Sequence, residues 1–376
     1  MIRAAHAAAR LATRQLPAEA LKQHQARALA EAAANGYVAL AEMGAPHIGG
    51  AGDLRIAAGW NAEDAAARPV PEVLPYWGEA ASSEEHARAL VAQFGGVIRG
   101  LAGDLNIDGS LGSRTAALRA GYHDAGDEHG AFYLDVEQAA AHLAACSLAG
   151  IQGGFHVIGD AGLDVALEAL DRAAKEVGPQ RVRAAGHRFE HVEMVDAAAV
   201  ERLASYAVTV SAQPAFDAAW GGPGGLYERR VGERSRSMNP FASFYAAGVP
   251  VCFGSDSPVT PLRPWSSVRA CVEHHNQDER ISARAAFLGH TRAGWRAARH
   301  ANPMAGQLVP GAPASFAVWE VEELMVQVAD GRVQSWSTDP RARTPLLPAL
   351  DTGSDPVCLQ TVKDGAELFV SPALRS

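Results

Sequence analysis

The sequence predicts an α/β protein: a TIM-like (β/α) barrel that is missing its first strand and carries a small C-terminal β-sandwich portion. Short apolar runs alternate with longer Ala-, Leu- and Glu-rich segments of helical period, an order typical of parallel strands joined by crossover helices. After about residue 306 the pattern changes to short alternating runs with Pro-Gly and Asp-Gly turns. We therefore expect the barrel over residues 1–305 and the β-sandwich-like appendage over residues 306–376.

Seven strand cores follow one another in the barrel region. They are residues 37–42, 73–77, 103–107, 154–158, 188–193, 208–213 and 249–254. Helical periods separate them, clearest in residues 83–94, 136–150, 163–178 and 196–207. A closed barrel of this kind has eight strand-helix units. Seven units in this register indicate that the first strand precedes Met1.

Composition excludes several classes of protein. The 376 residues are 48% hydrophobic, which is enough for a large core, and the net charge is -9 with no basic run beside aromatic residues. A nucleic-acid partner is therefore not expected. No apolar stretch reaches the roughly 20 residues of a membrane span. The four cysteines (Cys146, Cys252, Cys271 and Cys358) form no CxxC pair, which argues against a disulfide framework and for a cytoplasmic location.

Three polar residues stand where predicted strands end. His156 lies in FHVIGD, His191 in RFEHVE and Asp256 in FGSDSP. The carboxyl ends of barrel strands meet at one open end, so these side chains are expected to converge on a divalent metal. Each has a structural alternative, a hydrogen-bonded strand-end histidine or a capping aspartate, but their joint occurrence in order favours the metal site.

The expected chemistry is hydrolysis by metal-activated water. A bound divalent metal lowers the pKa of its water to about 7 and polarises a carbonyl group. Asp256 is the expected acid/base residue, because its carboxylate can accept a proton from the attacking water and pass it to the leaving nitrogen. The two histidines are expected to be neutral ligands. Zinc is the favoured metal, and manganese or iron would tolerate the same ligands.

Four motifs, DGSLGSRTAAL, FHVIGDAGLDVALEAL, HRFEHVEMV and GSDSPV, occur in this order and resemble those of the metal-dependent amidohydrolase superfamily, closest to the branch with N-substituted formamide deformylases. The likeness runs from NGYVALAEMG to VPGAPASFAVWE. It implies a distorted barrel of the metal-dependent hydrolase type, a β-sandwich built from both chain ends, and hydrolysis of non-peptide carbon-nitrogen bonds. His156 and His191 match the family's metal-binding histidines, and Asp256 matches the aspartate that contacts the metal and moves the proton.

The sequence departs from this family at two places. Members usually carry a His-x-His pair on the first barrel strand, and no such pair occurs here. His274 and His275 cannot replace it, because neighbours on the helix expected there point in different directions. At Asp104 many relatives have a carboxylated lysine that bridges two metals. Asp104 is therefore either a ligand or a strand-end aspartate bonded to loop amides, and the two readings carry equal weight.

Rival functions find less support. A serine hydrolase needs a GxSxG turn and a dinucleotide enzyme needs GxGxxG after its first strand, and neither occurs in that context. The alternative kept open is a truncated, catalytically silent barrel that acts as a binding or scaffold protein. The expected substrate is a small amide, formamide or cyclic amide, and the one protein partner considered is a second copy in a homodimer.

Overall fold

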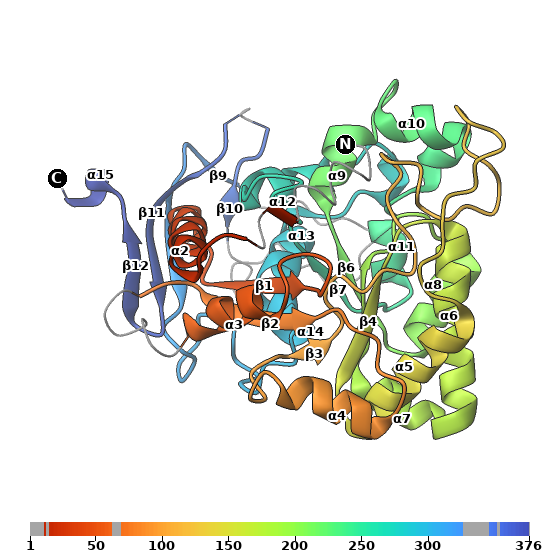
Figure 1. Ribbon diagram of the computed structural model, residues 1–376. Helices are drawn as coiled ribbons and strands as arrows, with labels where there is room; N and C mark the ends of the chain where they lie inside the picture. The colour runs from red at the N-terminus through yellow and green to blue at the C-terminus, as the bar shows by residue number, and fades with distance from the viewer. Residues whose placement is uncertain (1–10, 13–14, 62–68, 326–345, 352–353, 376) are drawn as a thin grey trace.

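The computed structural model describes residues 11–12, 15–61, 69–325, 346–351 and 354–375. Its centre is a curled sheet of seven parallel strands that follow one another in chain order (Figure 1). The strands are β1 (Ala39–Gly44), β2 (Glu72–Trp77), β3 (Gly100–Leu101), β4 (Gln152–Val157), β5 (Arg188–His191), β6 (Thr209–Ala212) and β7 (Val251–Phe253). This arrangement confirms the α/β class and the parallel order, and the sheet has the form of a partial barrel.

The third strand differs from its prediction. It covers Gly100–Leu101 and not residues 103–107, because Gly103 adopts a positive φ of 54° that bends the chain out of the sheet. A side chain at Gly103 would place its Cβ 2.4 Å from the carbonyl oxygen of Gly44, so the bend also brings two strand ends close together. The chain touches the sheet again at Asn106, which forms an isolated parallel bridge with His156.

The four clearest helical predictions are confirmed by α4 (Glu84–Ala92), α5 (Val136–Ala149), α6 (Asp160–Val177) and α8 (Ala197–Ser205). Sequence signals set their ends. Asp135 and Gln138 form a capping box at the start of α5, and Gly150 ends that helix in the left-handed conformation. Apolar faces of α5 and α6 pack on β4 and β5, where Phe155 and Phe189 are fully buried.

The described residues also form further helices, most of them short. They are α2 (Ala18–Ala34), α3 (Ala51–Gly59), α7 (Pro179–Ala185), α9 (Pro214–Trp220), α10 (Leu226–Val231), α11 (Phe241–Ala246), α12 (Pro264–Val272), α13 (Ala283–His290), α14 (Arg292–Ala297) and α15 (Pro372–Arg375), with 3-10 turns η1 (Gly232–Ser237) and η2 (Gln277–Glu279). Among the described residues, none of these helices combines the length and apolar character needed to cross a lipid bilayer.

The C-terminal region forms small antiparallel sheets, as the turn-rich pattern indicates. One contains β12 (Ala366–Val370), β11 (Val357–Lys363) and β8 (Phe316–Glu320), and the other pairs β10 (Leu347–Pro348) with β9 (Leu324–Met325). Helix α2 lies against the three-stranded sheet (Figure 1), where the Thr361 hydroxyl donates to the carbonyl of Ala33 at 2.6 Å. A complete β-sandwich and the boundary at residue 306 stay predictions.

Candidate functional site

A cavity of about 2430 Å³ opens at the carboxyl ends of the parallel strands. All four residues predicted to bind a metal line it: Asp104, His156, His191 and Asp256. They come from the ends of β3, β4, β5 and β7, which are separated by up to about 150 positions in the sequence. The expectation that these side chains reach one open end of the barrel therefore agrees with the structure.

His156 is the penultimate residue of β4, and its side chain is 12% exposed toward the cavity. Its Nδ1 atom is buried without a hydrogen-bond partner, 3.8 Å from Oδ1 of Asp108. Burial, together with the charge of His191, lowers the pKa of His156 well below its ordinary value. The ring is therefore neutral, as a metal ligand must be.

Asp108 is a buried acidic residue beside the His156 ring. Its buried carboxylate accepts the backbone N–H groups of Ala117, Ile158 and Gly159 at 2.8, 2.9 and 2.8 Å. Burial raises the pKa of Asp108 to about 7, and the three donors oppose that rise. This network fixes the loop that follows β4 and places a carboxylate beside the His156 ring.

His191 ends β5 with a positive φ of 73°, an uncommon conformation for a non-glycine residue. Its Nδ1 lies 2.7 Å from Oε1 of Gln213, and the Gln213 amide donates in turn to the carbonyl of Ser211 at 3.0 Å. An amide oxygen only accepts, so Nδ1 carries a proton and Nε2 is the nitrogen left to bind either a metal or a second proton. Burial lowers the pKa of His191, and surrounding carboxylates, Asp256 first, raise it above its ordinary value.

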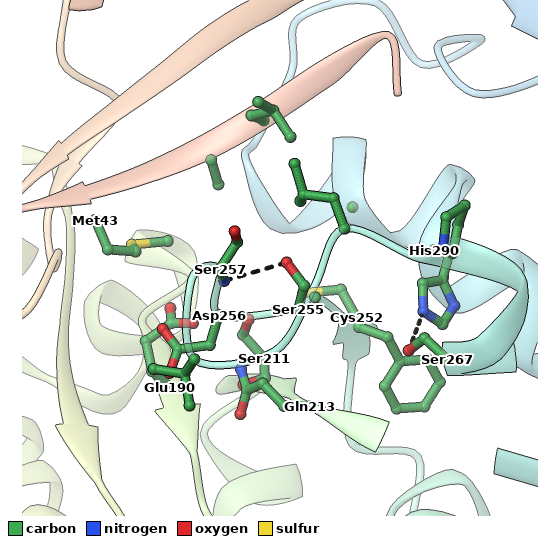
Figure 2. Close-up of a pocket in the computed structure, with 18 of the residues that line it drawn as sticks. Met43, Glu190, Ser211, Gln213, Cys252, Ser255, Asp256, Ser257, Ser267 and His290 are labelled. Carbon is green, nitrogen blue, oxygen red and sulfur yellow. Dashed lines mark hydrogen bonds between the residues drawn. The ribbon is translucent and has the colours of Figure 1, made fainter. Parts of the chain in front are cut away.

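Asp256 lies three residues beyond β7, also with a positive φ, of 52°. Burial raises its pKa, and the charges of Asp104 and Glu190 add to the rise while His191 opposes it. Figure 2 shows Asp256 next to Glu190 on the cavity wall, with Ser211 and Gln213 nearby. A carboxyl group with a raised pKa in a cleft suits a residue that must both accept and give a proton.

The sequence reasoning missed His47. It follows β1 in the loop GAPHIGG and lines the same cavity, with Nε2 3.7 Å from Oδ2 of Asp104. Its charge also contributes to the lowered pKa of His156. The available signal was its place directly after a predicted strand, the same signal that identified the other site residues.

The donor set fits a divalent metal. Nδ1 of His191 is within hydrogen-bond distance of Gln213, the kind of partner that histidine ligands commonly engage with the nitrogen that does not bind the metal. Nδ1 of His156 lies 3.8 Å from Asp108 and has no hydrogen-bond partner. Carboxylates stand beside the two imidazoles in a partly closed cavity. His156, His191, Asp104 and Asp256 do not form a compact group in the described residues, however, so their assignment as ligands stays a prediction.

The described residues do contain one compact group of that kind, at Asp217, His274 and His275, whose ligand atoms all lie within 4.8 Å of one another. The expectation that His274 and His275 occupy a helix and point apart is wrong. Helix α12 ends at Val272, and the two rings stack at 4.6 Å between centroids. The turn after the helix lets consecutive side chains face the same carboxylate.

Comparisons with known proteins agree with this geometry. A model of the amidohydrolase family matches residues 1–369, and the chain therefore belongs to that family.

Individual relatives are more distant. Protein LONG AFTER FAR-RED 3 of Arabidopsis thaliana is 28% identical over 221 residues, which cover 56% of this chain and 37% of that protein. An uncharacterized metal-dependent hydrolase from Pyrococcus furiosus superposes with a TM-score of 0.64 at 23% identity, over 80% of this chain and 60% of that one. A mutant of atrazine chlorohydrolase TrzN from Arthrobacter aurescens TC1, complexed with zinc and atraton, superposes with a TM-score of 0.58 at 12% identity. The superposition covers 98% of this chain and 78% of that one.

These structural likenesses show a shared fold. The match to the plant protein spans about a third of its length.

Proposed function

We propose that this chain is a metal-dependent hydrolase of carbon-nitrogen bonds in small amide-type substrates, with zinc held by His156 and His191. The observation that carries the proposal is the meeting of two cavity-facing imidazoles with Asp256 at one barrel end. Membership of the amidohydrolase family supports the reaction class. The formamide deformylase branch is the substrate class that the sequence motifs favour.

When bound, the metal supplies an activated water and polarises the substrate carbonyl. The residues of the chain transfer the proton and position the ligands. Asp256 accepts the proton of the attacking water and delivers it to the leaving nitrogen, a transfer suited to its raised pKa. Gln213 holds the tautomer of His191, and Asp108 stands behind His156. His191 and Asp256 both have positive φ values and line the cavity at the strand ends.

The test is Asp256→Asn, with Asp127→Asn in an exposed loop as the matched control. The amide cannot accept the proton, so hydrolysis of a panel of N-formyl and N-acyl amines by the zinc-loaded protein should fall about 10²- to 10⁴-fold. Circular dichroism should stay unchanged, and turnover is compared at saturating zinc because Asp256 is also one of the predicted ligands. Near-normal turnover in the folded Asp256→Asn protein would remove Asp256 from the mechanism.

One observation favours a second candidate, a catalytically silent barrel that binds ligands or partners. The family's His-x-His pair is absent from the 376 residues. This candidate predicts a folded, zinc-loaded chain that binds amides without hydrolysing any of the panel. Sedimentation of the same sample tests the homodimer, and cell fractionation tests the cytoplasmic location.

A further inference from the structure

A second set of metal-ligand side chains lies outside the cavity described above. It joins Asp217 of α9 to His274 and His275, which follow α12. The side chains of Asp217 and His274 are 2% and 0% exposed, and that of His275 is 11% exposed. Helices α9 and α12 pack against each other, so the group closes a buried junction behind the cavity wall.

His274 brings an unused nitrogen to this junction. Its Nε2 is buried without a hydrogen-bond partner, although Oδ1 of Asp217 lies 3.3 Å away. Its Nδ1 is 3.1 Å from both the backbone nitrogen and the carbonyl oxygen of Asn276. When Nδ1 donates to that carbonyl, Nε2 presents a lone pair to the carboxylate, the tautomer that a metal ligand adopts.

His275 repeats this arrangement with its nitrogens exchanged. Nε2 lies 3.0 Å from the carbonyl oxygen of Ser235, and a carbonyl only accepts, so Nε2 carries a proton. Nδ1 then directly faces Oδ1 of Asp217. Either a proton, carried by the ring or by Oδ1, or a cation must lie at this contact, because two lone pairs repel. A second proton would satisfy His275 but would leave Nε2 of His274 unbonded.

Asp217 is held so that one oxygen serves both rings. Its Oδ2 accepts the backbone N–H of His275 at 3.0 Å, which leaves Oδ1 facing the two imidazoles. Tetrahedral zinc with bonds of about 2.0–2.2 Å separates neighbouring ligand atoms by roughly 3.3–3.6 Å. The 3.3 Å between Asp217 and His274 has that value, whereas the shorter contact between Asp217 and His275 must lengthen.

Gly221 keeps space open beside these atoms. Its φ of -81° and ψ of -23° suit any residue, so backbone conformation does not require glycine. A Cβ there would lie 2.5 Å from Oδ1 of Asp217 and 2.7 Å from Nδ1 of His275. Any side chain would therefore intrude on the converging ligand atoms.

We propose that Asp217, His274 and His275 bind a structural zinc ion, distinct from the metal of the main cavity. Two imidazoles and a carboxylate in a buried position suit zinc. The ring nitrogens that face away from Asp217 lie beside the carbonyl oxygens of Asn276 and Ser235, as the non-binding nitrogens of histidine ligands commonly do. The ion ties α9 to the segment after α12. Since Phe216 of α9 stacks on His191, with ring centroids 5.9 Å apart and planes at 13°, this tie also steadies the wall of the main site.

The test measures zinc bound after dialysis by the full-length His156→Ala, His191→Ala double variant, which lacks the main-site histidines. We expect it to retain one equivalent of zinc per chain, and adding His274→Gln should remove that equivalent. Adding Gly221→Ala should also remove it while leaving all three ligands in place. The control is His290→Gln, since both ring nitrogens of His290 are already bonded, to Ala286 and Ser267; it should keep the zinc.

A double variant without zinc, or zinc that survives His274→Gln, would overturn the proposal. If any variant fails to fold, the wild-type protein decides the question. Zinc-edge anomalous diffraction from its crystals should show a peak between His274 and Asp217, and its absence at saturating zinc would equally overturn the assignment. This result does not depend on hydrolysis, so failure here and failure of the proposed reaction can be told apart.

Discussion

Replacing Asp108 by asparagine should weaken both the fold and the metal site. The carboxylate accepts three backbone N–H groups, whereas an amide has one oxygen and must turn its NH₂ toward at least one donor. A stranded buried N–H costs about 1–3 kcal/mol, and each bond weakened by loss of charge costs about 1 kcal/mol. The free energy of unfolding should therefore fall by about 3–5 kcal/mol. Because Asp108 stands behind His156, zinc affinity should fall about 10- to 100-fold.

Urea unfolding and competitive zinc titration measure the two effects. Leu143→Ala is the control for stability. Truncating this fully buried side chain of α5 should lower the free energy of unfolding by about 2–5 kcal/mol without changing the metal site. Asp135→Asn is the control for chemistry, because asparagine caps a helix as well as aspartate. The role of Asp108 in positioning His156 is refuted if Asp108→Asn has the same free energy of unfolding and the same zinc affinity as the wild type. It is also refuted if Asp108→Asn binds zinc no more weakly than Leu143→Ala.

Two further predictions concern histidines. Gln213→Ala removes the acceptor that fixes His191, so zinc affinity should fall about 10- to 100-fold in a competition titration; unchanged affinity would contradict the tautomer assignment. Burial lowers the pKa of His142, His187 and His290 to about 4, 3 and 4. Below the unfolded value of about 6.5 the unfolded chain binds more protons, so stability should fall between pH 6.5 and 4, by at most roughly 3 kcal/mol per histidine. Equal urea midpoints at pH 7 and pH 5 would contradict this.

Hydrophobic periodicity predicted most of the strands of the sheet. The motifs at strand ends identified the residues that line the main cavity. His156, His191 and Asp256 were found because each follows an apolar run closely, and parallel strands bring their ends together. The third strand was misplaced because the apolar pattern of residues 103–107 does not reveal the bend at Gly103. One residue with positive φ outweighs the local β-propensity.

Tertiary contacts account for what the sequence could not show. Asp217 and His274 are 57 positions apart and meet only because α9 packs on α12. Asp108 is buried because its carboxylate accepts N–H groups from two other segments of the chain, and the sequence GDLNIDG does not show which segments these are. The sequence reasoning missed His47 because no second histidine lies near it in the chain. Its place in the site is visible only from the structure, where it lies next to Asp104.

Zinc-edge anomalous diffraction from crystals of the zinc-loaded protein would locate the metal of the main cavity. We expect a peak at about 2.0–2.1 Å from a ring nitrogen of both His156 and His191, with Asp256 facing it from the end of β7. A main cavity without anomalous density at saturating zinc, or density bonded to neither histidine, would contradict the assignment of this cavity as the metal-dependent active site.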